Sequence, residues 1–125
     1  MHERQERVIQ DLPVFDAKTY LRVERCRVWC EHCGGPKRQQ LEGVDDQQRV
    51  TRRLAESIWM LCEHGAIAHG ARFFGVHWHT VKRLDKRRLK SRFGTMDYEA
   101  VRVIGVDEFA LHKGHRYATV VVEPS

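Results

Sequence analysis

The sequence predicts an α+β protein in which a three-helix unit lies between two short β-hairpins. Three observations support this fold class. Apolar residues recur at helical spacing between residues 47 and 90, and a single glycine interrupts them at Gly75. Alternating or β-branched runs lie on both sides of this segment. Turn-forming residues separate these regions, so domain boundaries are expected at 1–43, 44–92 and 93–125.

The first region is expected to form a charged β-hairpin. Residues 6–12 have strand character, and residues 12–16 contain Pro and Asp, which suit a turn. From residue 19 to residue 29 the side chains alternate, and so many charges predict that at least one face is exposed. One face of this second strand is expected to carry Leu21, Val23, Arg25 and Arg27.

The hairpin leads into a Cys-x-x-Cys motif, Cys30 to Cys33, followed by two glycines. Two thiolates at this spacing can bind one zinc ion, but a structural zinc site needs four ligands. This half of a zinc ribbon leaves two alternatives: zinc held with the help of Cys26, His32 or His2, or free thiols in an incomplete site. A redox motif is a third alternative, but the βαβ context it needs is lacking.

The next helix is expected from Gln47 to His64, capped by Asp45 or Asp46 and ended by Gly65. It should bury the apolar side of the two helices that follow, with Trp59 and Met60 as additional packing residues. Its apolar stripe consists of Val50, Leu54, Ile58, Leu61 and Cys62.

The segment Ala66–Lys90 has the pattern of a helix-turn-helix. Gly75 suits the tight turn, because glycine adopts positive φ without strain. Gly70 interrupts the first helix at a cost of roughly 1 kcal/mol, and His77 is expected at the N-cap position of the second. The apolar face of the second helix is expected to carry Val76, Val81, Leu84 and Leu89.

The second helix of this pair is strongly basic, with seven Lys or Arg residues and one acid between Lys82 and Arg92. Such clustering favours a polyanionic partner, and a recognition helix places its N-terminal residues in the major groove. The alternative is an ordinary helical hairpin whose basic face is solvated and does not bind DNA. Base contacts are expected from His77, Trp78, His79 and Arg83, and phosphate contacts from Lys82, Lys86, Arg87, Arg88 and Lys90.

The last region changes character after a linker at Phe93–Asp97. Strands are expected at Val101–Val106 and Tyr117–Val122, joined by a polar connection at Phe109–His115. Consecutive residues of the second strand are apolar, so both of its faces are expected to be buried against other parts of the protein. Asp107 directly follows the first strand, where a carboxylate is either a metal ligand or an exposed strand-end acid.

The net charge and the hydropathy of the chain indicate which kinds of partner it can bind. The chain carries 22 Lys and Arg against 17 Asp and Glu, a formal net charge of +5. It has no apolar run of about 18 residues, and its charged N-terminus is unlike a signal peptide. The expected setting is the cytoplasm, where cysteines are reduced thiols or metal ligands. The expected partners are double-stranded DNA and a second copy of the chain, in a homo-oligomer, but no membrane.

With these motifs the sequence resembles the bacterial insertion-sequence transposases of the ISL-three family. The resemblance rests on the Cys-x-x-Cys motif after a basic strand, on the helix-turn-helix ending TVKRLDKRRLK, and on VIGVDEFALHKGHRYATVVVE. It covers essentially the whole chain but only about the first third of a typical family member. The chain would then be the N-terminal part of a transposase, truncated at both ends.

The resemblance implies that the C-terminal hairpin begins a ribonuclease-H-like domain with a DDE triad and two divalent metals such as magnesium. Asp107 matches the first acid, and the other two would lie downstream. Cys30 and Cys33 match the second knuckle of a zinc ribbon whose first knuckle would precede Met1. The implied function is transposon-end recognition in DNA transposition, without strand transfer by this chain alone.

Two other classes of function compete with this interpretation. One is a small helix-turn-helix regulator or repressor that binds DNA without transposon ends. The other is a protein-interaction module whose exposed strand edge pairs with another chain.

Overall fold

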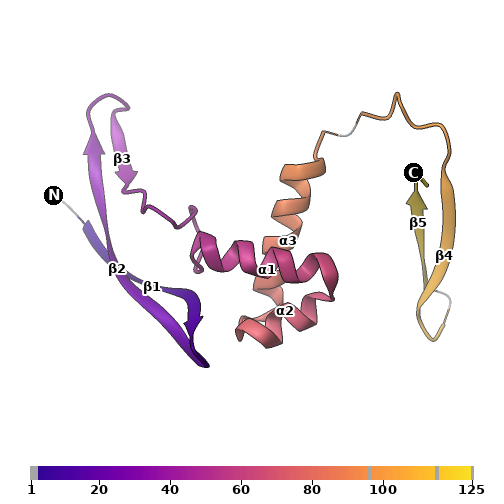
Figure 1. The fold of residues 1–125 in the computed structure, drawn as a ribbon. Helices are drawn as coiled ribbons and strands as arrows, with labels where there is room; N and C mark the ends of the chain where they lie inside the picture. The colour runs from indigo at the N-terminus through magenta and orange to yellow at the C-terminus, as the bar shows by residue number, and fades with distance from the viewer. Residues whose placement is uncertain (1–2, 96, 115, 125) are drawn as a thin grey trace. The chain divides into compact units, whose positions relative to one another are not determined.

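The computed structural model describes residues 3–95, 97–114 and 116–124, and these form five strands and three helices (Figure 1). The α+β fold class predicted from the sequence is therefore confirmed. The chain divides into two compact units, residues 1–92 and 93–125. The first unit contains a sheet and all the described helices, and the second contains a hairpin.

The N-terminal sheet is antiparallel with the order β1-β2-β3. Its strands are β1 (Glu3–Val14), β2 (Ala17–Cys30) and β3 (Gly35–Arg38). The first two are longer than predicted, and β3 was not predicted. Phe15, at φ 55°, forms the tight turn between β1 and β2 and is almost fully exposed. The paired strands thus extend beyond the region where the apolar pattern is visible.

The two faces of this sheet differ in burial. On the outer face, exposed ion pairs join the strands, with 3.8 Å between Arg4 and Glu24 and 3.9 Å between Arg22 and Glu6. The inner face carries the buried residues Ile9, Asp11 and Arg25. The strand pairing puts Leu21, Val23, Arg25 and Arg27 on this inner face, as the alternation predicted.

Helix α1 (Arg52–His64) begins five residues later than the predicted start at Gln47. Tertiary contact with β1 explains the correction. The backbone of Gln10 accepts a 2.9 Å hydrogen bond from Thr51 N and donates one of 2.8 Å to Arg49 O. This bridge holds the backbone at Val50 against β1, which keeps it from joining the helix.

The N-cap of α1 is Thr51, whose side chain accepts a 3.3 Å hydrogen bond from Leu54 N. The prediction of Asp45 or Asp46 as the cap was therefore wrong. Both carboxylates lie upstream of the true helix start and form ion pairs instead, Asp45 with Arg52 and Asp46 with Arg25.

Helices α2 (Ile67–Phe74) and α3 (Trp78–Phe93) complete the first unit. Gly70, inside α2, is buried, and a Cβ there would lie 3.5 Å from Cys62 Sγ and 3.6 Å from Val81 Cγ1. These are ordinary van der Waals distances, so the packing of the three helices does not exclude a Cβ at this position. The core of the first unit consists of Val50, Leu54, Ala55, Ile58, Val76, Val81 and Leu84.

Several predicted core residues lie at the edge of this core or outside it. Leu61 and Cys62 are half-buried. Leu89 and Met60 are exposed, at 47% and 67%. Leu89 lies five residues beyond Leu84, the last residue of α3 in the core.

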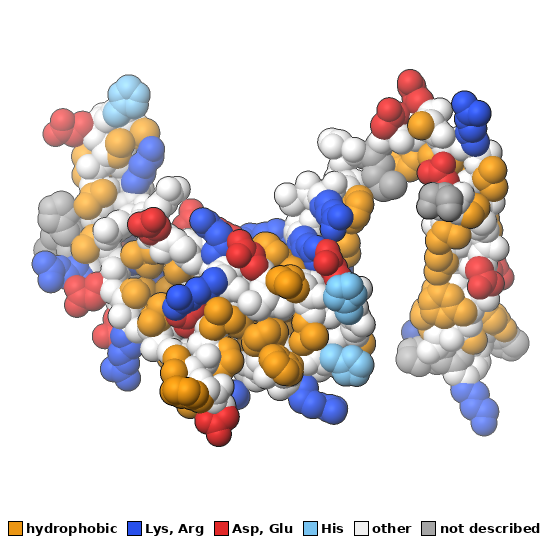
Figure 2. Space-filling view, in the orientation of Figure 1, with side chains coloured by type: hydrophobic (Ala, Val, Ile, Leu, Met, Phe, Trp, Pro, Cys, Tyr) orange, Lys and Arg blue, Asp and Glu red, His pale blue; other side chains and the backbone are white. Residues whose placement is uncertain are grey.

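The second unit contains the antiparallel strands β4 (Gly105–His112) and β5 (Arg116–Val122). Strand β4 begins after most of the predicted strand Val101–Val106, and the predicted connection Phe109–His115 largely belongs to it. Residue 115 of this connection and residue 96 of the predicted linker lie outside the described residues. Apolar side chains are exposed along the hairpin (Figure 2), and Val121 is 61% exposed.

Among the described residues, no helix combines the length and apolar character that crossing a bilayer requires.

Candidate nucleic-acid interface

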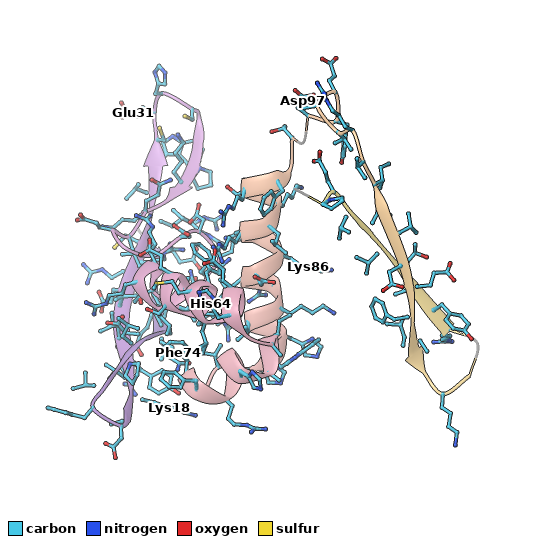
Figure 3. The ribbon with its side chains drawn as sticks, turned by 45° about the vertical axis from the view of Figure 1, so that its right-hand side comes forward. Lys18, Glu31, His64, Phe74, Lys86 and Asp97 are labelled. Carbon is cyan, nitrogen blue, oxygen red and sulfur yellow. The ribbon has the colours of Figure 1, made fainter. Side chains whose placement is uncertain are left out.

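The turn between α2 and α3 depends on Gly75. It lies in the left-handed region, at φ 61° and ψ 35°, where residues with a Cβ are strained. The carbonyl of Ala71 accepts hydrogen bonds from Gly75 N and, at 3.0 Å, from Val76 N. Lys18 of β2 lies beside this turn, close to Phe74 (Figure 3). The glycine turn of the predicted helix-turn-helix is present.

His77 is the residue before α3 and takes the N-cap role. Its Nδ1 accepts a 3.3 Å hydrogen bond from His79 N, and its carbonyl accepts bonds from Thr80 N and Val81 N. A histidine ring therefore satisfies one of the free N–H groups that Ser, Thr, Asp or Asn usually cap. This contact orients the His77 imidazole at the start of the helix.

An aromatic cluster surrounds the first turn of α3. The His77 and His79 rings stack with centroids 5.3 Å apart, and the Trp78 ring meets His79 edge-on at 5.1 Å. Lys82 Nζ lies 4.9 Å from the centre of the Trp78 ring. Such a cation–π contact restrains the ammonium group while leaving it able to meet an anion.

The two sides of α3 differ sharply in burial. Val81 and Leu84 are buried in the core. Positions spaced three and four residues apart share one face of a helix, and the opposite face of α3 is exposed. Lys86 projects from α3 away from α1 (Figure 3). The exposed cationic face is defined here as Arg83, Lys86, Arg87 and Lys90, and His77, Trp78 and His79 adjoin it at the helix start.

Arg88 lies on a different side of the helix from the other predicted phosphate contacts. Its Nη1 donates a 3.0 Å hydrogen bond to Trp59 O, and its Nη2 forms an ion pair with Glu63. Its side chain is only 20% exposed. Arg88 thus joins α3 to α1, and we leave it out of the exposed cationic face.

Trp59 forms hydrogen bonds that join α1 to α3, whereas the sequence pattern predicted only a packing role for it. Its Nε1 donates a 3.2 Å hydrogen bond to Leu84 O. Because Trp59 O also accepts from Arg88, one residue of α1 fixes two consecutive turns of α3. No local pattern predicts this pair of contacts, since both join residues at least 25 positions apart.

The two knuckle cysteines lie close together, Cys30 as the last residue of β2 and Cys33 in the turn that leads to β3. Hydrogen bonds from the Cys33 backbone and thiol lower the pKa of the Cys30 thiol, as a metal-binding cysteine requires. Within the described ranges, however, no group of three His, Cys, Asp or Glu residues could hold a metal ion. Cys30 and Cys33 thus do not fit a closed four-ligand zinc site within these residues. His2 lies outside the described residues.

Asp107 occupies an exposed position in β4, paired with Val120. It was expected directly after a buried strand, but the strand begins later and is not covered within the second unit. A two-metal site for phosphoryl transfer needs several acids, and the described residues bring no such group around Asp107. We therefore derive no catalytic step from it.

Comparisons with known proteins agree with the helix-turn-helix geometry. The family model for the helix-turn-helix domain of transposase family ISL3 matches residues 39–89. The chain is 48% identical over 124 residues to the transposase for insertion sequence element IS1001 of Bordetella parapertussis. That match covers 99% of this chain and 30% of the relative. No solved structure matches the chain. The comparisons thus identify residues 39–89 as a helix-turn-helix domain of transposase family ISL3, and the chain spans about a third of the length of this relative.

Proposed function

We propose that this chain binds double-stranded DNA through α3, as the N-terminal part of a transposase that recognises transposon ends. The observation that carries the proposal is the exposed cationic face of α3, which adjoins an aromatic helix start and lies opposite a buried core. Helix-turn-helix proteins place such a helix in the major groove. The relative is named a transposase for an insertion sequence element, which supports transposon ends as the DNA.

The proposed contacts with bases and with phosphates come from different positions along α3. His77, Trp78, His79 and Arg83 lie at or near the N-terminal end of α3, from which recognition helices reach base edges. Lys86, Arg87 and Lys90 lie farther along the same side, and their flexible cationic side chains suit phosphates. Lys82, held over Trp78, suits the backbone next to the base contacts.

A mobility-shift titration tests the proposal. The probes are duplexes with the terminal sequences of an ISL3-family insertion element, compared with mixed-sequence duplexes. We expect the end duplexes to bind more tightly, and the Arg83→Gln/Arg87→Gln variant to lose most of this binding. The control variant Arg4→Gln/Arg22→Gln removes the same charge from the outer face of the sheet and should bind normally. Equal loss in both variants would reject α3 as the binding surface.

A footprint on DNA that lacks transposon ends would favour the regulator over the transposase. Binding to no duplex at all would reject DNA binding for the chain.

A further inference from the structure

The inner face of the N-terminal sheet changes character along its length. Around Ile9 and Asp11 it is buried against the three-helix unit. Nearer the start of β1, a cleft of about 410 Å³ opens between the sheet and the loop that precedes α1. The name arginine cleft is used here for this cavity, which is lined by Arg7, Arg25, Arg27, Arg38 and Arg49.

The acids around the arginine cleft do not balance its positive charge. Glu3 pairs with Arg27 at 3.5 Å, and Asp46 pairs with Arg25 at 3.4 Å. Arg7 donates to a neutral partner, the Gln48 carbonyl, at 2.9 Å. Within the part of the chain that the structure describes, no ion pair involves the exposed side chains of Arg38 and Arg49.

Two further observations favour an anion as the ligand of this cleft. Arg25 is only 5% exposed, yet its buried Nε has no acceptor among the described residues. An unpaired buried donor is unfavourable, and a ligand oxygen would satisfy it. Burial lowers the pKa of Arg7, and the positive charges of Arg25, Arg49 and Arg38 lower it further. Converging like charges of this kind are relieved by a bound anion.

The chemistry of the cleft selects the class of anion. Guanidinium groups present several N–H donors in a plane and match the oxygens of a phosphate group. We propose that the arginine cleft binds a phosphate of the DNA backbone, in addition to the contacts of α3. This inference rests on the proposed function, and the cleft and α3 belong to the same compact unit. A free phosphate ion offers the same chemistry, and the test must separate the two sources.

The salt dependence of DNA binding tests this site. The Arg38→Gln/Arg49→Gln variant removes two exposed charges, so the fold should be unaffected. The matched control, Arg4→Gln/Arg22→Gln, removes two arginines from the outer face of the same sheet. Each phosphate contact contributes about 0.9 to the slope of log K against log salt. With a mixed-sequence duplex of about 20 base pairs, we expect the cleft variant to lower the slope by about 0.9, the loss of one phosphate contact.

The outcomes separate this inference from the proposed function. If the unmodified chain binds no duplex, the proposed function fails and this inference fails with it. If the chain binds and Arg83→Gln/Arg87→Gln weakens it, but the cleft variant matches the outer-face control, only the arginine cleft is rejected.

Calorimetric titration with inorganic phosphate at constant ionic strength separates the two sources of anion. We expect phosphate alone to bind only weakly. Tight phosphate binding that the cleft variant abolishes, with its duplex affinity and salt slope unchanged, would assign the cleft to a small free anion and overturn the proposal.

Discussion

The hydroxyl of Thr51 donates a 2.7 Å hydrogen bond to Asp11 Oδ1, so the N-cap of α1 is itself held by the N-terminal sheet. The same carboxylate accepts a 2.7 Å hydrogen bond from Arg53 Nε and a second one from Arg53 Nη2. Asp11 is only 2% exposed. One buried acid therefore joins β1 to the first turn of the helix that supports α3.

Replacing Asp11 with Asn should lower the free energy of unfolding by about 2 kcal/mol at neutral pH, since charged hydrogen bonds are lost. Arg53 and Thr51 hold the pKa of Asp11 well below its ordinary value of 3.8. The folded-state pKa is depressed, so this stabilisation is fully present above the ordinary value and is lost as the pH falls towards the depressed one. Urea denaturation of both proteins should therefore show a difference that narrows below about pH 4. A difference that stays constant from neutral to acidic pH would contradict this role.

Replacing Gly75 with Ala should lower the free energy of unfolding by about 1–2 kcal/mol, because a Cβ is strained at φ 61°. The neighbouring Lys18 side chain is flexible and can move aside, so backbone strain is the main cause. Thermal unfolding measures the change. Asn tolerates this backbone region better than Ala, so Gly75→Asn is the matched control and should lie between the two. An Ala variant as stable as the original chain would show that the turn does not depend on glycine.

The elements that depend on local pattern were predictable from the sequence. Helices α2 and α3 and their glycine turn follow from apolar spacing and from the backbone freedom of Gly75. The alternation in β2 likewise predicted which side chains share a face. These features depend on neighbours within a few residues, and the printed sequence contains that information.

Elements set by distant contacts were not predictable. The start of α1 depends on Gln10, about 40 positions away, which holds the backbone before Thr51 in an extended bridge. The contacts of Arg88 also depend on residues distant in the sequence. The fold brings its side chain to Glu63 and to the Trp59 carbonyl, and the sequence pattern suggested a phosphate contact instead. Helical spacing alone does not distinguish an arginine bound to another helix from one facing solvent.

Arg87 and Arg88 should respond oppositely to the same substitution. Arg87 is exposed, so Arg87→Gln should leave stability unchanged and lower the salt slope of DNA binding by about 0.9. Arg88→Gln removes the contacts with α1 and should lower the free energy of unfolding by about 1 kcal/mol. Urea denaturation and a salt titration on the same two variants test both effects. Equal salt slopes for the two variants would contradict the proposed division of α3.

The Cys30→Ser/Cys33→Ser variant should leave the unfolding of the three-helix unit unchanged. Both cysteines lie outside the apolar core, and the described residues provide no third and fourth ligand that would make the pair a folding site. Thermal unfolding of the variant, and of the original chain with and without a chelator, measures the effect. A fall of several degrees in either case would show that a metal at the knuckle stabilises the unit.

His77 should have a capping role that can be separated from its proposed contact with DNA. His77→Ala removes the Nδ1 acceptor of His79 N and should lower the free energy of unfolding by about 1 kcal/mol, whereas His77→Asn supplies a new cap and should restore it. Both variants should weaken DNA binding, because neither keeps an imidazole at the helix start. His79→Ala is the matched control: it removes an exposed ring whose side chain caps no backbone group among the described residues, so stability should not fall. Urea denaturation and mobility-shift titration on these three variants would resolve the two roles. Full DNA affinity in His77→Asn would limit His77 to capping α3.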